Sequence, residues 1–345
     1  MRQLRTLLST LLLTTAAPAM AASSLPSGAW DSYRASFLDA SGRIVDTGNH
    51  GISHSEGQGY GLLLAVMADD PANFDRIWSF TRTQLLIRDD GLAAWRWTPD
   101  AEPPVTDLND ASDGDILIAL ALARGGATWQ RADLTQAART LAEAIGSRLL
   151  FAHDGQTLLR PGVSGFDRGE RPDGPVVNLS YWVFEAFGEL AALAPSYDWS
   201  GVGASGRHLL ANLLQDRPLP PEWLSVARQP KPAAGFPDEF GYNALRLPLY
   251  LLRANQGDAD LLRKLAAGMS DENGNLRIVD LASGATKETL TDPGYRILPA
   301  AIACALDGTP VPEELRRFAP TLYYPSTLHL LALDALNETH PECLR

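Results

Sequence analysis

The stretch HSEGQGYGLLLAVM, residues 54–67, places polar and glycine residues directly before an uninterrupted apolar run. From Gln58 to Met67 the apolar residues recur at the spacing of an α-helix. Ser55 and Glu56 stand where an N-cap residue and a first-turn acid are common. The stretch therefore predicts a helix that carries a carboxylate, Glu56, at its N-terminal end.

The same helical spacing recurs along the rest of the chain. It predicts helices over residues 74–86, 115–123, 134–150, 179–193, 207–214, 242–252, 259–267, 295–306 and 321–336. Two strand-like segments, residues 43–45 and 275–279, are too few to build a sheet. The chain is therefore predicted to be all-α and, because no low-complexity linker divides it, to form a single domain over residues 22–345.

The N-terminal residues 1–21 have the composition of a secretory signal peptide. Arg2 and Arg5 precede an apolar run, residues 7–13, and small residues stand at Ala19 and Ala21. A membrane anchor is the alternative, but the run is far shorter than the roughly 20 residues that span a bilayer. We expect cleavage after Ala21 and a protein that is periplasmic or secreted.

Charge and cysteine content narrow the function classes. The formal net charge of -12 argues against nucleic acid or anionic lipid as a partner, since a phosphate-binding face needs clustered Lys and Arg. Cys304 and Cys343 are the only cysteines, too few for a disulfide framework or a zinc site. They could form one bridge, or Cys304 could be a buried thiol in its apolar helix. No cofactor is predicted.

A second acidic motif, ASDGD at residues 111–115, also precedes an apolar helix. Its two acids, Asp113 and Asp115, are most simply interpreted as helix-capping residues. A calcium site is the weaker alternative, because loops that bind calcium usually supply more oxygen ligands.

Aromatic residues lie near these motifs and near loop edges. Trp and Tyr rings suit stacking on the apolar faces of sugars, although core packing is the commoner role for any one ring. The rings concerned are Tyr60, Trp95, Trp97, Trp129, Tyr181, Trp182, Trp223 and Tyr242.

These segments together resemble family 8 of the glycoside hydrolases, and most closely the periplasmic cellulases found with bacterial cellulose synthases. The resemblance rests on their order and spacing and covers nearly the whole mature chain. The segments are SEGQGYG at residues 55–61, W-x-W at 95–97, ASDGD at 111–115, NLSY at 178–181 and YNALR at 242–246.

The resemblance implies a barrel of six inner and six outer helices, an (α/α)6 barrel, with an open cleft across the N-terminal ends of the inner helices. It implies cleavage of internal β-1,4-glucan bonds with inversion, with Glu56 as proton donor and Asp113 at the sugar beside the cut. The immediate neighbours of Glu56 offer few counter-charges, which favours its protonated form. The candidate substrate contacts are Tyr60, Trp95, Trp97, Asp115, Tyr181, Tyr242, Asn243 and Arg246.

The base position departs from the best-known branch of the family, because Asn243 stands where that branch has an Asp. An amide cannot accept a proton from water. Asp113, Asp238 and Glu239 are the candidate replacements, of which we favour Asp113 as the second carboxylate. Asn243 would then position the water or bind the sugar, and Arg246 would pair with a cleft carboxylate or a hydroxyl, a surface ion pair being its ordinary role.

The sequence thus predicts an endo-1,4-β-glucanase that acts on cellulose or cello-oligosaccharides and is linked to bacterial cellulose biosynthesis, with the cellulose synthase export machinery as a further expected partner. Two alternatives stay open. The chain could have another family 8 specificity, such as chitosanase or xylanase. Because of Asn243, it could also bind glucan without cutting it.

Overall fold

The structure is a computed structural model that describes residues 23–345. The expected signal peptide and its cleavage site after Ala21 lie outside the described residues. No helix among residues 23–345 is both long enough and apolar enough to cross a membrane.

Helices dominate the described part of the chain. The α-helices are α1 (Ala29–Phe37), α2 (Ser55–Met67), α3 (Pro71–Gln84), α4 (Ser112–Thr128), α5 (Ala132–Leu149), α6 (Phe187–Leu193), α7 (Trp199–Asp216), α8 (Leu247–Ala254), α9 (Ala259–Met269), α10 (Pro293–Asp307), α11 (Glu313–Arg316) and α12 (Tyr323–Thr339). Short 3-10 helices are η1 (Leu179–Tyr181), η2 (Phe184–Ala186), η3 (Ala244–Arg246) and η4 (Pro341–Leu344).

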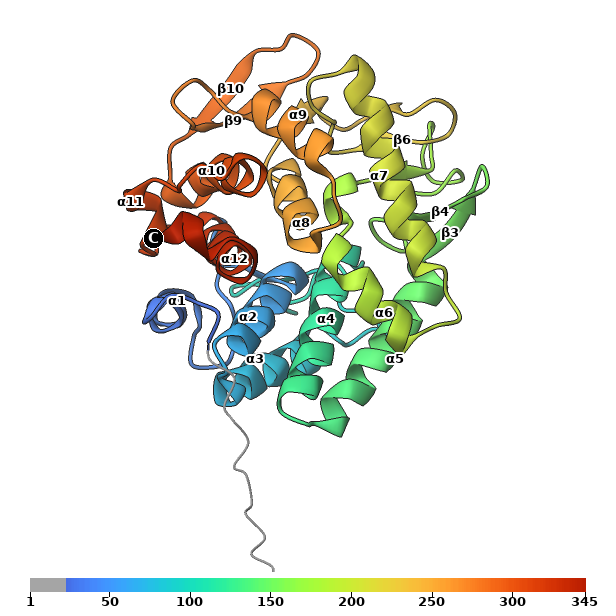
Figure 1. Ribbon diagram of the computed structural model, residues 1–345. Coiled ribbons are helices and arrows are strands. Elements are labelled where there is room, and N and C mark those ends of the chain that lie inside the picture. Colours follow the sequence, from blue (N-terminus) through green and yellow to red (C-terminus); the bar gives the residue numbers. More distant parts are fainter. Residues whose placement is uncertain (1–22) are drawn as a thin grey trace, which may run out of the picture.

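The helices form a ring in two layers (Figure 1). Helices α2, α4, α8 and α12 surround the centre, and α1, α3, α5, α7 and α9 lie outside them. The central helices α2 and α4 are surrounded on almost every side. Every residue from Gly57 to Ala65 in α2 and from Ser112 to Leu122 in α4 is buried, and most of these residues are apolar. A helix that is apolar all round needs neighbours on all sides, and the second layer supplies them. The all-α, barrel-like class predicted from the sequence is confirmed.

Glycines of the opening stretch let α2 approach its neighbours closely. A Cβ at Gly59 would lie 2.6 Å from the Cβ of Leu117 in α4, and one at Gly61 would lie 2.5 Å from Ile44. Neither distance is one that real Cβ atoms show. These two glycines therefore serve helix packing rather than the approach of a ligand.

The strands are short and lie in loops at the ends of helices. They are β1 (Ser53–His54), β2 (Arg96–Trp97), β3 (Leu150–His153), β4 (Gln156–Leu159), β5 (Val176–Val177), β6 (Leu224–Ser225), β7 (Lys231–Pro232), β8 (Glu239–Phe240), β9 (Leu276–Asp280) and β10 (Thr286–Leu290). They pair antiparallel as β1-β2, β3-β4, β5-β6-β7 and β8-β9-β10. As expected from the sequence, no large sheet forms within residues 23–345.

Three local predictions need correction. The predicted helix over residues 179–193 is broken into η1, η2 and α6, and the helix predicted from residue 242 begins as η3 and becomes regular only at Leu247. Helix α1 was not predicted. Asn178 caps the start of η1, because its side chain accepts the N–H of Ser180.

The two cysteines form a disulfide between Cys304 in α10 and Cys343 in η4. Cys343 is 1% exposed, and the bridge closes a segment of 39 residues. Of the two alternatives raised by the sequence, the bridge is therefore the one that the structure contains, and it attaches the C-terminal segment to the helical ring.

Candidate active site

A cleft of about 710 Å³ opens at the N-terminal ends of α2, α4, α10 and α12. This is the end of the ring where the resemblance placed it. Loops that carry Trp95, Phe166 and Trp223 extend its walls, and η3 contributes Arg246 to its floor. The cleft therefore draws on segments from nearly the whole described chain.

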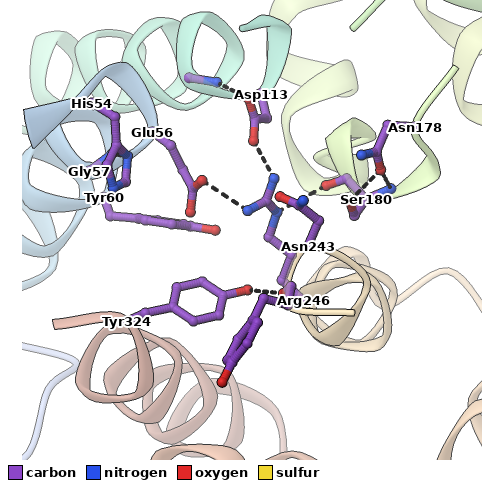
Figure 2. A network of polar contacts seen from close by, with 12 residues as sticks. His54, Glu56, Gly57, Tyr60, Asp113, Asn178, Ser180, Asn243, Arg246 and Tyr324 are labelled. Carbon is purple, nitrogen blue, oxygen red and sulfur yellow. Dashed lines mark hydrogen bonds and ion pairs between the residues drawn. The ribbon is translucent and has the colours of Figure 1, made fainter. Parts of the chain in front are cut away.

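Glu56 and Asp113 meet at the floor of the cleft through one guanidinium group (Figure 2). Glu56 is in the first turn of α2 and Asp113 in the first turn of α4. Nη1 of Arg246 donates to Oε2 of Glu56 at 2.9 Å, and Nη2 of Arg246 donates to Oδ2 of Asp113. Both helices present their N-terminal ends, where a carboxylate is favoured by the helix dipole.

Arg246 is almost completely buried, with 2% of its surface exposed. Its Nε donates to the backbone oxygen of Ser180 at 3.2 Å, and its guanidinium carbon lies 5.3 Å from the ring centroid of Tyr181. A buried cation is tolerated because two carboxylates and a carbonyl surround it. The ordinary interpretation of Arg246 as a surface residue is thus wrong, and so is the expectation that Glu56 has few counter-charges.

The two carboxylates differ in exposure. Asp113 is 1% exposed, and its burial, the first cause, and the charge of Glu56 raise its pKa to about 6, although Arg246 and the N–H of Gly114 act in the opposite direction. Glu56 lines the cleft, and its Oε1 is buried and has no hydrogen-bond partner among the described residues. Because Arg246 holds Oε2, Oε1 is the oxygen of Glu56 that is left without a protein donor.

His54 holds the first turn of α2 in place, a role that the sequence assigned to Ser55. Its Nδ1 accepts the N–H of Gly57 at 3.0 Å, and its Nε2 lies 3.4 Å from Oδ2 of Asp46. Because Nδ1 accepts, the ring proton is on Nε2 and points to Asp46. Asp46 and His54 both line the cleft, and neither was predicted from the sequence to be a site residue.

Aromatic side chains line the walls of the cleft. Trp95, Tyr181 and Tyr242, all predicted substrate contacts, border it, and Tyr242 is 45% exposed. Trp223 stacks on Phe166 with ring centroids 5.5 Å apart and an angle of 5° between the planes. Such flat apolar surfaces beside carboxylates suit a ligand with apolar faces and polar edges.

Three predicted contacts do not reach the cleft. Tyr60 is fully buried, and its hydroxyl bonds that of Tyr250. Trp97 packs against Phe80, with centroids 5.7 Å apart, and lies outside the described cleft lining. Asp115 is fully buried and accepts the N–H of Ala93 at 2.8 Å.

Tyr60 and Asp115 are buried, Trp97 is partly buried, and none of the three is in the described lining of the cleft. Burial, together with the charge of Asp110, raises the pKa of Asp115 well above its ordinary value. A protonated Asp115 would not bind a cation, and no group of three potential metal ligands occurs among residues 23–345.

Asn243 lies in the cleft lining, as predicted, and contacts a residue that the sequence did not suggest. Its backbone N–H donates to Oε1 of Glu222 at 2.7 Å, and its Nδ2 donates to Oε2 of Glu222 at 3.3 Å. The two other candidate bases face elsewhere: Asp238 lies 3.7 Å from Arg217, and Glu239 pairs with Lys287. Neither is in the described lining of the cleft.

Comparison with known proteins points to one family. Residues 1–335 match the family model described as glycosyl hydrolases family 8. A probable endoglucanase of Novacetimonas hansenii is 37% identical over 320 residues, which cover 90% of each chain.

Solved structures give the same result. The endo-beta-1,4-glucanase CMCax from Acetobacter xylinum is 35% identical, with a TM-score of 0.77 over 89% of this chain and 96% of that one. A GH8 endo-beta-1,4-glucanase from an Achatina fulica gut metagenomic library is 31% identical, with a TM-score of 0.79 over 90% and 97% of the two chains. With its fold, its cleft and its sequence all in agreement, the chain belongs to family 8 of the glycosyl hydrolases.

Proposed function

We propose that this protein is an endo-1,4-β-glucanase that cuts internal bonds of cellulose or cello-oligosaccharides with inversion. The main observation behind the proposal is that Arg246 donates hydrogen bonds to both Glu56 and Asp113 at the floor of an open, aromatic-lined cleft. An open cleft admits the middle of a long chain, which endo-cleavage requires. The relatives named endoglucanase support the same activity.

In the proposed reaction Glu56 is the proton donor. Its carboxyl group protonates the glycosidic oxygen as the bond to the anomeric carbon breaks, while Arg246 orients that group through Oε2. Water attacks the anomeric carbon from the opposite face and gives its proton to a carboxylate. The products are a new reducing end of inverted configuration and a new non-reducing end.

We assign Asp113 as the second catalytic carboxylate. It is coupled to Glu56 through Arg246, and a pKa raised to about 6 suits a group that gains and loses a proton near neutral pH. Asn243 would orient the water or a sugar hydroxyl. Trp95, Tyr181 and Tyr242 would contact the glucan, because all three residues line the cleft that also holds the carboxylates.

We further propose that the chain is exported and that residues 1–21 are removed. The composition of those residues supports this, and the Cys304–Cys343 disulfide suits an oxidising compartment. A place beside cellulose synthesis and export rests on the sequence resemblance alone.

A second candidate is a glucan-binding protein without catalysis, which Asn243 favours because the usual base is missing. One experiment separates the two. The purified mature protein is mixed with carboxymethyl cellulose and with cellohexaose, and viscosity, new reducing ends and the anomer of the first product are followed by NMR. Rapid loss of viscosity with an inverted α-anomer supports the endoglucanase, whereas tight binding with no new reducing ends supports the binding protein.

A further inference from the structure

A buried carboxylate, Glu222, lies directly behind Asn243. Glu222 is 8% exposed and is outside the described lining of the cleft. It precedes β6, and its own N–H donates to the backbone oxygen of Glu239 at 3.0 Å, which fixes the segment to β8. The chain runs close to it at Gly241, where a Cβ would lie 2.6 Å from Oε1 of Glu222.

Within residues 23–345, Glu222 accepts hydrogen bonds only from the turn that carries Asn243. Its Oε1 accepts the backbone N–H of Asn243 at 2.7 Å and that of Ala244 at 3.4 Å. Its Oε2 accepts the side-chain Nδ2 of Asn243 at 3.3 Å. Through these hydrogen bonds the buried carboxylate fixes the position of both the backbone and the side chain of Asn243.

The side-chain contact decides which way the amide of Asn243 faces. An ionised carboxylate accepts and cannot donate, so only the NH2 group of Asn243 can face Glu222. The carbonyl oxygen, Oδ1, must then point to the other side, and Asn243 borders the cleft. Oδ1 is thus placed to accept a hydrogen bond from a water or hydroxyl in the cleft.

We propose that Glu222 is a positioning residue that holds the amide of Asn243 with Oδ1 turned into the cleft, where it orients the water that attacks the anomeric carbon. This inference rests on the proposed hydrolase function and deepens it. It gives Asn243 a defined role, and it depends on a carboxylate that no sequence motif indicated.

The pair also explains why an amide, and not a carboxylate, suits position 243 in this chain. An aspartate there would face Glu222 across a hydrogen-bond distance, and two like charges would repel each other in a buried place. Burial already raises the pKa of Glu222, against the three N–H donors, and the nearby charge of Glu239 acts in the same direction as burial. Glu239 is itself paired with Lys287.

The test compares Glu222→Gln, Asn243→Asp and the double variant, with Glu272→Gln as the control. Glu272 is an exposed acid between α9 and β9 and is outside the described lining of the cleft. In Glu222→Gln the new amide can either accept from Asn243 or donate to it. The side-chain amide of Asn243 can therefore adopt either orientation. We expect kcat on cellohexaose to fall about 10- to 100-fold, with KM changed less than about twofold, because the water and not the sugar loses its orientation.

The double variant gives a second readout that loss of folding cannot imitate. Asn243→Asp alone should be poorly active because Glu222 repels the new carboxylate, and Glu222→Gln/Asn243→Asp should exceed it by about 10-fold or more, since the glutamine can donate to the aspartate. The control Glu272→Gln should keep the parental kcat and KM. Thermal unfolding of each variant reports whether it is folded.

Two results would overturn the proposal. One is a folded Glu222→Gln variant with kcat within twofold of the parent. The other, decisive if that variant does not fold, is a double variant no more active than Asn243→Asp. Failure of the proposed function itself looks different, because the parent protein would then release no reducing ends from cellohexaose.

Discussion

Gly114 in α4 lies directly against Ser55 in α2, so closely that a Cβ on Gly114 would overlap Oγ of Ser55 and come within 2.7 Å of the backbone nitrogen of Glu56. The two residues stand at the start of adjacent central helices, and each is next to a cleft carboxylate. Their contact therefore sets the separation of Glu56 from Asp113, and with it the fit of both carboxylates to Arg246.

The variant Gly114→Ala should consequently damage both stability and catalysis. The new methyl group has no space, and the backbone of α2 must move, at a cost of about 1–3 kcal/mol in the free energy of unfolding. A displacement near 1 Å at Glu56 should lower kcat on carboxymethyl cellulose by about 100-fold. Urea unfolding and reducing-end assays measure the two effects.

Gly188→Ala is the matched control for that change. Gly188 also lies in a helix, α6, but a Cβ there meets nothing within 4 Å. Alanine should stabilise the helix by up to about 1 kcal/mol and leave kcat unchanged. Equal kinetics in Gly114→Ala and Gly188→Ala would mean that the Ser55 contact does not set the spacing of the carboxylates.

Burial of Asp113 should make stability fall as the pH rises. The pKa of its carboxyl is about 6 in the folded protein against an ordinary value of 3.8. The folded state therefore binds more protons than the unfolded state between about pH 4 and pH 6, and the free energy of unfolding decreases through that window. At 1.36 kcal/mol per pH unit the loss due to Asp113 is about 3 kcal/mol.

The variant Asp113→Asn removes this contribution. Between pH 4 and pH 7 it should lose about 2 kcal/mol less stability than the parent, because part of the change due to Asp113 lies below pH 4; urea unfolding at both pH values measures this. Burial also raises the pKa of Asp110 to about 6, but Asp110 is present in both proteins, so its contribution cancels when their stabilities are compared. The exposed Asp89 provides a control, Asp89→Asn. Parallel pH profiles for the parent and Asp113→Asn would contradict the assignment.

The parts of the site that could be predicted from sequence are those with local signals. Glu56 and Asp113 each stand at the junction of a polar motif and an apolar helix, so their place at helix N-termini follows from nearby residues. The direction of a neighbouring side chain follows less easily. Asp115 is two residues after Asp113, about 200° around the helix, and it therefore faces away from the cleft.

Tyr60 shows a different limit of the sequence pattern. It shares a face of α2 with Glu56, but four residues of helix place it about 6 Å deeper in the ring, beyond the cleft floor. Arg246 is 190 residues from Glu56 and 133 residues from Asp113 along the chain, and Glu222 is 21 residues from Asn243. Such contacts depend on tertiary packing and leave no periodic signal.

The Cys304–Cys343 disulfide should contribute stability without contributing to catalysis. Neither cysteine is in the described lining of the cleft. Closing a segment of 39 residues reduces the entropy of the unfolded chain by an amount worth about 4 kcal/mol. The double variant Cys304→Ala/Cys343→Ala should therefore unfold at lower urea concentration by about that free energy, with kcat at 25 °C unchanged.

Reducing agent supplies the control for the disulfide. Dithiothreitol should shift the unfolding curve of the parent toward that of the double variant, and it should leave the double variant unaffected. A parent whose curve does not respond to the reductant, although its thiols become titratable, would show that the bridge adds no stability.

The variant Glu56→Gln should abolish cleavage and preserve glucan binding. Glutamine keeps the shape of the side chain, and its amide oxygen can still accept from Arg246, but it has no proton to give to the glycosidic oxygen. We expect a loss of about 10²- to 10⁴-fold in kcat, measured as reducing ends from cellohexaose, with a dissociation constant within a few-fold of the parent by calorimetry.

The control variant Glu143→Gln, on the exposed face of α5, should match the parent in both kcat and the dissociation constant. If Glu56→Gln kept substantial activity, the proton donor would have to be another of the carboxylates that line the cleft, and the free Oε1 of Glu56 would need another explanation.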